Sequence, residues 1–259
     1  MAPSAYTRVA ALGATAAWYL GVYYASVPLS GRSRIRALSL LQRWSRRACR
    51  LLRLDVQVHG RPYAGPCVYV SNHRSYVDIP LLSAVLGVSF LSRADVAGWP
   101  IFGTVARAIG TVFVDREDPH ARARAALALT RRSESIIVFP EGTTRAERLP
   151  CEFSRGLFRL LRHIELPLVP VTIRYSDRRV YWDDESTWAQ HLRARVLDGP
   201  PITAAVHIRE PLPVACCDAA VAASAVCQAI EEFGELVSPQ DRRSADLSAG
   251  EHGHHRLGE

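Results

Sequence analysis

Residues 67–86 have the sequence CVYVSNHRSYVDIPLLSAVL, and this stretch decides the fold. Residues 67–71 are mostly β-branched or aromatic, which predicts a short buried strand. Residues 79–86 are almost entirely apolar and predict a helix. His73 therefore lies on a turn at the carboxyl end of a strand, which is where open α/β sheets bind their ligands.

The turn carries His73 and, five residues later, Asp78. Such a spacing can bring the carboxylate back against the imidazole. A carboxylate on one ring nitrogen fixes the tautomer and leaves the other nitrogen free to take a proton. The pair then predicts a general base that activates a hydroxyl group. The alternative is purely structural: His73 caps backbone groups of the turn, and Asp78 is an N-terminal residue of the helix.

Short strands alternate with helices on both sides of this stretch. The pattern is typical of an α/β sheet, and we expect a mixed sheet covered by helices on both faces, in one domain over residues 55–238. The predicted strands are 56–60, 67–71, 88–92, 111–115, 135–139, 168–174 and 202–209, and the predicted helices are 78–86, 100–109, 119–132, 153–163, 186–197 and 217–237.

The N-terminal 54 residues differ in composition from this domain. Residues 9–31 form an uncharged run of 23 residues. A run of this length is long enough for a helix that enters a bilayer. One Arg precedes the run and eight lie in the 22 residues after it, so the positive-inside rule places the body on the cytoplasmic side of the cell membrane. A cleaved signal peptide and an ordinary packed helix are the alternatives.

Residues 33–54 predict a basic amphipathic helix, because apolar residues recur every three or four positions and most Arg lie off that stripe. Such a helix, with Trp44 on its apolar side, is typical of a membrane surface. The alternative is a helix that packs on the domain with a solvated Arg face. Together, 9–31 and 33–54 predict a two-helix membrane-anchoring segment, spanning or monotopic.

The net charge of +7 is concentrated at this end. Residues 1–60 hold nine Arg and one Asp, so the remaining 199 residues sum to −1. A basic end on a near-neutral body favours a membrane lipid surface and argues against nucleic acid as a partner. The six Cys form no C-x2-C pair, which predicts core thiols and no metal site. Residues 239–259 are polar and His-containing, and we expect a disordered tail.

Three further blocks follow the His73 turn: GTVFVDR over residues 110–116, FPEGT over 139–143 and VPV over 169–171. Together with N-H-x4-D, these four blocks, in this order, resemble the glycerolipid acyltransferase family, which includes the 1-acylglycerol-3-phosphate enzymes. The resemblance covers residues 60–175. It implies that His73 and Asp78 are catalytic. It also implies an N-terminal two-helix anchor like that of bacterial relatives.

The family binds its acceptor with the second and third motifs. The resemblance therefore implies substrate-binding roles for five residues: Arg116, Glu141, Gly142, Thr143 and Arg145. From the residues alone, Arg116 could instead form an exposed ion pair with its acidic neighbours. Backbone N–H groups after residues 140–142 are candidate donors to the oxyanion.

The expected reaction is transfer of a fatty acyl group from a thioester to the free hydroxyl of a lysolipid. We expect the transfer to be direct, because the sequence has no G-x-S-x-G motif of the kind that would indicate a covalent acyl-enzyme. The expected acceptor is 1-acyl-sn-glycerol-3-phosphate, the donor is an acyl carrier protein or coenzyme A thioester, and no cofactor is expected. A non-catalytic lipid-binding protein and a secreted esterase are the rivals from other classes.

The third motif departs from the pattern of many lysophosphatidate enzymes, in which Arg directly follows the motif's Thr. Here Thr144 holds that place and Arg145 comes one residue later. A one-residue shift re-aims the guanidinium group. Relatives that use lyso-ornithine lipid resemble this chain as well, notably over residues 94–103, so that lipid or another lysophospholipid is the alternative acceptor.

Overall fold

The computed structural model describes residues 4–99, 101–115, 117–144, 153, 155–161, 164, 166–182, 187–197, 199–212, 219–236 and 255–256. Two of the predicted substrate-binding residues, Arg116 and Arg145, lie outside these ranges. The other predicted site residues lie within them.

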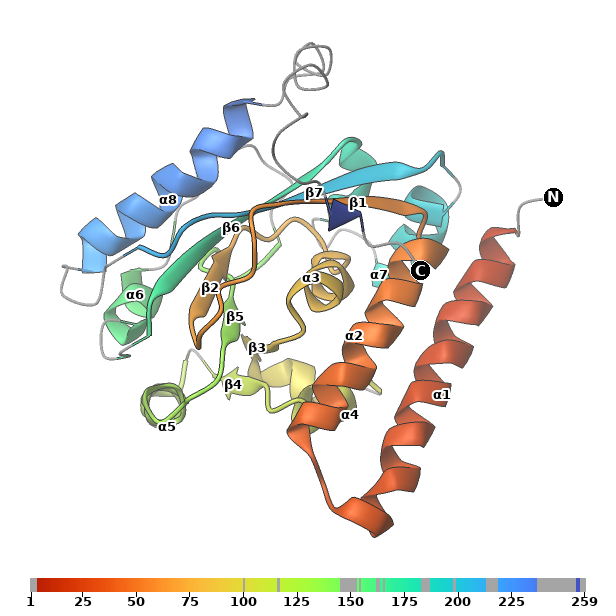
Figure 1. The fold of residues 1–259 in the computed structure, drawn as a ribbon, viewed down its shortest axis with the longest axis horizontal. Coiled ribbons are helices and arrows are strands. Elements are labelled where there is room, and N and C mark those ends of the chain that lie inside the picture. Colours follow the sequence, from red (N-terminus) through yellow and green to blue (C-terminus); the bar gives the residue numbers. More distant parts are fainter. Residues whose placement is uncertain are drawn as a thin grey trace.

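The described strands form one mixed sheet in the order β4-β3-β5-β2-β6-β7-β1-β8 (Figure 1). Neighbours are parallel except for β6–β7 and β1–β8, which are antiparallel. The strands are β1 Leu54–His59, β2 Val68–Ser71, β3 Ser89–Arg93, β4 Val112–Val114, β5 Ile136–Val138, β6 Leu168–Tyr175, β7 Ile202–Ile208 and β8 His255–Arg256. Of the predicted tail, the structure describes only β8.

Strand β2 is buried along its whole length, because helices cover both faces of the sheet. Its side chains alternate: Val68 and Val70 enter one core, and Tyr69 enters the other. The first core is closed by α5 (Pro119–Thr130), α6 (Arg155–Leu161) and α8 (Ala219–Leu236); the second is closed by α2 (Arg34–Leu51), α3 (Asp78–Leu86) and α4 (Phe102–Ala108). Figure 1 shows α8 and α2 on opposite sides of the sheet. The prediction of a mixed sheet covered on both faces is confirmed.

The N-terminal helices pack on each other and on the domain (Figure 1). Helix α1 (Ala5–Ser30) lies along α2, and α2 packs against α3. Ala37 and Cys49 of α2 are buried in the same core as Tyr69, so α2 is part of the domain's interior as well as its basic surface. Among the described residues, no helix has both the length and the apolar character that a membrane span requires.

Two segments depart from the predicted helices. The predicted helix 186–197 is described as α7 (Trp188–His191) followed by a π-helical segment, η3 (Leu192–Leu197). A 3-10 turn, η1 (Ala94–Gly98), precedes α4, and Ile101 between them has a positive φ of 64°. A second 3-10 turn, η2 (Arg178–Val180), follows β6.

Candidate active site

The chain leaves the sheet at Asn72, one residue after β2 ends. The Asn72 side-chain amide donates to the carbonyl of Ile173 in β6 at 2.9 Å, and its carbonyl accepts from the Ile173 N–H at 2.7 Å. The side chain therefore pairs with β6 as a backbone residue would. This frees the main chain to turn while the hydrogen bonds of β6 stay satisfied.

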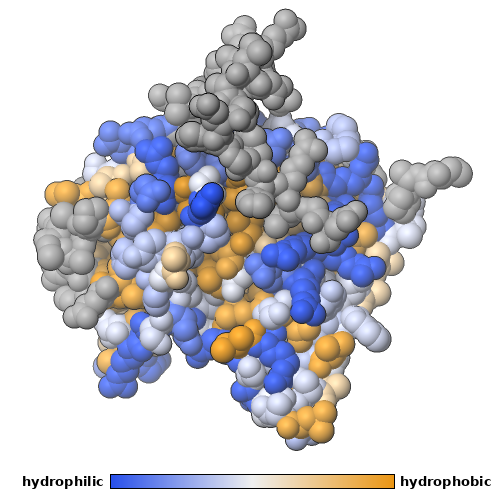
Figure 2. Space-filling view, in the orientation of Figure 1, coloured by the Kyte–Doolittle hydropathy of each residue, from blue (hydrophilic) through white to orange (hydrophobic). Residues whose placement is uncertain are grey.

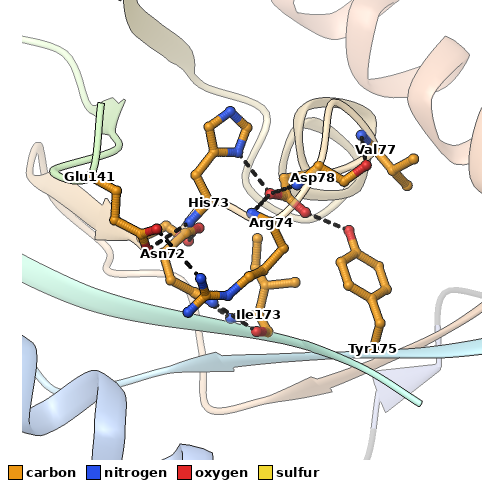
Figure 3. A network of polar contacts seen from close by, with 10 residues as sticks. Asn72, His73, Arg74, Val77, Asp78, Glu141, Ile173 and Tyr175 are labelled. Carbon is orange, nitrogen blue, oxygen red and sulfur yellow. Dashed lines mark hydrogen bonds and ion pairs between the residues drawn. The ribbon is translucent and has the colours of Figure 1, made fainter. Parts of the chain in front are cut away.

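Asp78 is the first residue of α3, and its side chain is completely buried. Its Oδ2 accepts from His73 Nδ1 at 2.8 Å, from the Arg74 N–H at 2.6 Å and from the Ser75 N–H at 2.9 Å (Figure 3). Its Oδ1 accepts from the Tyr175 hydroxyl at 2.6 Å. A buried carboxylate needs such donors to remain charged. The turn is thus folded around this one carboxylate.

The contact between His73 and Asp78 fixes the state of the imidazole. A carboxylate accepts hydrogen bonds, so Nδ1 carries the ring proton and Nε2 keeps a lone pair. The His73 ring also stacks on Phe139, with centroids 4.0 Å apart and planes 15° apart. The His73 side chain is 16% exposed, whereas Asp78 is not exposed at all. The arrangement can therefore take a proton from a group that reaches the exposed side of the ring.

Tyr175 is the residue that the sequence analysis missed. It ends β6, where its ring lies in the core, so from sequence it resembles any buried aromatic residue. Burial, and next the charge of Asp78, hold the pKa of Tyr175 well above its usual range, which keeps the hydroxyl a donor. In the structure, Tyr175 is two residues beyond Ile173, the strand residue to which Asn72 is hydrogen-bonded, so both side chains of β6 lie on the same face of the strand as the His73 turn.

Glu141, one of the residues to which the family resemblance assigns substrate binding, has a fully buried side chain. Oε1 accepts from the His73 N–H at 3.2 Å, and Oε2 accepts from the Arg74 guanidinium at 3.4 Å (Figure 3). Glu141 thus holds the backbone of the turn from the side opposite Asp78.

His73 lines a cavity of about 780 Å³ between the sheet, α5, α6 and η1. Most of its wall is apolar, including Phe90, Leu157 and Leu160. Apolar pockets of this size hold most of a small ligand's surface. The remaining lining residues are Ile79, Leu91, Ser92, Arg93, Asp95, Val96, Trp99, Val114, Arg122, Ala123, Ala126, Phe139, Pro140, Gly142, Thr143, Thr144, Gly156, Arg159 and Trp182.

Two of the predicted substrate-binding residues, Gly142 and Thr143, line this cavity together with His73. Gly142 has a φ of 75°, a conformation that favours glycine, and its N–H is bonded to the Phe139 carbonyl at 3.1 Å. Arg122 and Arg159 also line the cavity but lie outside the four motifs, so sequence patterns gave no sign of them. Within the described part of the chain, no group of three His, Cys, Asp or Glu is placed to hold a metal ion.

The family model described as Acyltransferase matches residues 55–174, which include the His73 turn and all of β6 except Tyr175. A lyso-ornithine lipid O-acyltransferase of Pseudomonas aeruginosa is 32% identical over 212 residues, which cover 78% of this chain and 81% of that protein. A 1-acyl-sn-glycerol-3-phosphate acyltransferase of Neisseria gonorrhoeae is 29% identical over 134 residues, 49% of this chain and 52% of that protein.

The fold also resembles a solved structure. The 1-acyl-sn-glycerophosphate acyltransferase of Thermotoga maritima superposes with a TM-score of 0.60 at 22% identity, covering 90% of this chain and 99% of that one. This likeness concerns the fold alone, whereas the sequence match to the Pseudomonas enzyme runs over most of both chains. On the strength of that match and of the family model over residues 55–174, this chain belongs to the glycerolipid acyltransferase family.

Proposed function

We propose that this acyltransferase moves a fatty acyl group from an acyl thioester to the free hydroxyl of a lysolipid, with His73 as the general base. One observation carries the proposal: the 2.8 Å contact between His73 and the buried Asp78, on the wall of an apolar cavity. A base held in one tautomer beside a pocket for acyl chains is what direct transfer requires.

In this mechanism, Nε2 of His73 takes the hydroxyl proton as the lysolipid oxygen forms a bond to the thioester carbonyl. Asp78 stabilises the imidazolium that results. The C–S bond then breaks, and His73 returns the proton to the leaving thiolate. Positioned general-base catalysis contributes about 10²–10⁴ in rate. Binding both amphiphiles in one cavity adds the advantage of proximity.

Attack on the thioester builds negative charge on the carbonyl oxygen. The Gly142 N–H already donates to Phe139, so it is not a suitable oxyanion donor in this conformation. Thr143 and Thr144 follow on the same turn and line the cavity. We assign the oxyanion contact to their backbone N–H groups.

The acceptor that we propose first is 1-acyl-sn-glycerol-3-phosphate, whose phosphate would be bound by the second and third motifs through Arg116, Arg145, Gly142 and Thr143. Lyso-ornithine lipid is the second candidate. The specific observation in its favour is that the match to the Pseudomonas lyso-ornithine lipid enzyme runs over 81% of that protein, against 52% of the Neisseria glycerophosphate enzyme. The donor is an acyl carrier protein or coenzyme A thioester, and the mechanism uses no cofactor.

We further propose that α1 and α2 anchor the protein to the cell membrane, with the domain on the cytoplasmic side. Large apolar side chains are exposed on this helix pair. They include Trp18 in the middle of α1, Leu29 near the end of α1, and Ile35 at the start of α2. Arg residues accompany them along α2, an arrangement typical of helices at an anionic membrane surface. This exposure supports the proposal.

The test is acyl transfer by membranes that contain the wild type, His73→Ala or His120→Ala. His120 is an exposed histidine in the first turn of α5 and serves as the matched control. Lysophosphatidate and lyso-ornithine lipid are offered in parallel, each with carrier-protein and coenzyme A thioesters. Product from one acceptor that disappears in His73→Ala alone is the expected result. Transfer that survives in folded His73→Ala would show that another group is the base.

A further inference from the structure

We infer that the turn between η1 and α4 is a second membrane-contact surface, which places the mouth of the cavity against the bilayer. The inference rests on the proposed transfer to a membrane lysolipid. The surface, called here the mouth patch, consists of Trp99, Ile101 and Phe102.

The mouth patch exposes three large apolar side chains within four residues. Trp99 is 40% exposed, Ile101 47% and Phe102 46%. The rings of Trp99 and Phe102 meet edge to face, with centroids 6.4 Å apart. Single exposed apolar residues need no explanation, but a cluster of this kind marks an interaction surface.

The turn holds these side chains outward in a fixed arrangement. The Gly103 N–H donates to the Trp99 carbonyl at 2.9 Å, and the Arg107 guanidinium donates to the Ala97 carbonyl at 2.5 Å. A Cβ atom on Gly103 would collide with the Ala97 carbonyl, so only glycine permits this close approach of the two backbones. Ile101 has φ 64° and ψ −59°, a strained conformation for a β-branched residue, and strain of this kind concentrates at functional sites.

The occupant is a lipid surface, because the mouth patch is continuous with the cavity. Trp99 lines the same cavity as His73, whose wall is largely apolar. A lysolipid resides in a bilayer, and an apolar path from bilayer to cavity spares its chain from contact with water. Trp and Phe are also the side chains that favour the membrane interface.

The position of α4 relative to the N-terminal helices agrees with this. Helix α4 packs against α2, and Gly110, just after α4, lies against the side chain of Arg34 in the first turn of α2. The tip of the α1–α2 hairpin therefore lies at the same end of the molecule, with Leu29 and Ile35 exposed there. Figure 1 shows α4 beside the lower part of α2, and Figure 2 shows hydrophobic colouring at the hairpin tip. Exposed Arg107 adds positive charge that matches an anionic bilayer.

The experiment uses the full chain with vesicles of phosphatidylethanolamine and phosphatidylglycerol. Two variants remove one or two side chains of the mouth patch, neither of which lines the cavity: Ile101→Gly and the double variant Ile101→Gly/Phe102→Ser. Glycine relieves the positive φ at position 101, so the first variant retains the fold. The matched control is Val221→Ser, which replaces an exposed apolar residue (56% exposed) on α8, across the sheet from α4.

We expect the double variant to bind vesicles about tenfold more weakly for each side chain removed. Its KM for a lysolipid presented in vesicles rises correspondingly. Its kcat for a short-chain, monomeric lysolipid stays at the wild-type value, and Val221→Ser behaves as the wild type throughout.

Unchanged vesicle binding in both variants would overturn the inference. So would a loss of activity that appears only with the carrier-protein donor, because the mouth patch would then be a protein-docking surface. If the wild type transfers acyl groups to no lysolipid, the proposed function fails, but vesicle binding still decides whether the mouth patch contacts membranes.

Discussion

Replacing Tyr175 with Phe tests how the buried carboxylate of Asp78 is controlled. The change removes one hydroxyl and keeps the ring, which packs near Tyr181. Tyr175 is the donor to Oδ1 of Asp78, while the other three donors converge on Oδ2. A hydrogen bond to a charged group contributes about 1.5–3 kcal/mol, so we expect the free energy of unfolding to fall by that amount. Urea denaturation measures this loss.

The same substitution should change catalysis in a way that lost stability cannot. Without the Tyr175 hydroxyl, the charge of Asp78 is less dispersed and attracts the His73 imidazolium more strongly. If about half of the lost energy acts there, the acidic limb of the kcat/KM profile moves to higher pH by about 0.5–1 unit, since one unit corresponds to 1.36 kcal/mol. Activity near neutral pH then falls, while the plateau at higher pH changes little.

Tyr76→Phe is the matched control for this experiment. The Tyr76 hydroxyl contacts Nδ1 of His191 at 3.1 Å and is not one of the four donors to Asp78 named above. Its removal should destabilise the same region and leave the pH profile in place. If Tyr175→Phe lowers stability but its pH profile matches the wild type, Tyr175 is only a core residue and the reasoning is refuted.

Two further predictions concern the sheet. Asn72→Ala leaves the backbone N–H and C=O of Ile173 without their partners, which costs about 1–3 kcal/mol for each group. The variant should therefore lower the urea midpoint and the activity together. Intact activity would show that another group replaces the amide. His207 is a pH-dependent site, because burial, and next the charge of Arg209, lower its pKa from 6.5 to about 4. The unfolded chain therefore binds the proton first as the pH falls, so stability declines between pH 6.5 and about 4. Partial exposure limits the effect to roughly 1–2 kcal/mol. His207→Gln should flatten that decline in thermal melts, and an unchanged slope would contradict the assignment.

The elements of the fold could be predicted because each short strand has its own apolar run and each helix its own period. The sheet order could not, because long-range pairing decides it. β1 precedes β2 in the chain but pairs with β7, through a register from Leu54 opposite Ile202 to His59 opposite His207. Burial in α2 was equally hidden, since the Arg residues around Ala48 and Cys49 favour a surface position.

For the site, sequence predicted which residues meet but not all that holds them. His73 and Asp78 lie on one turn, so a local spacing was enough to predict their contact. Tyr175 reaches Asp78 across 97 positions of chain, and Glu141 reaches His73 across 68. Neither contact has a local signal, because a sequence motif records that a residue is present and not which way its side chain points.

The contacts of the Asn72 amide indicate which parts of the structure must be included if this site is grafted into another protein. Its two bonds tie the turn to Ile173, while Glu141 and Tyr175 hold the same turn from neighbouring strands. A seven-residue insertion carrying His73 and Asp78 into another α/β protein would bring the reactive ring without its supports. The smallest portable unit is therefore three adjacent parallel strands with their carboxyl-terminal turns, and a designer should graft that unit whole.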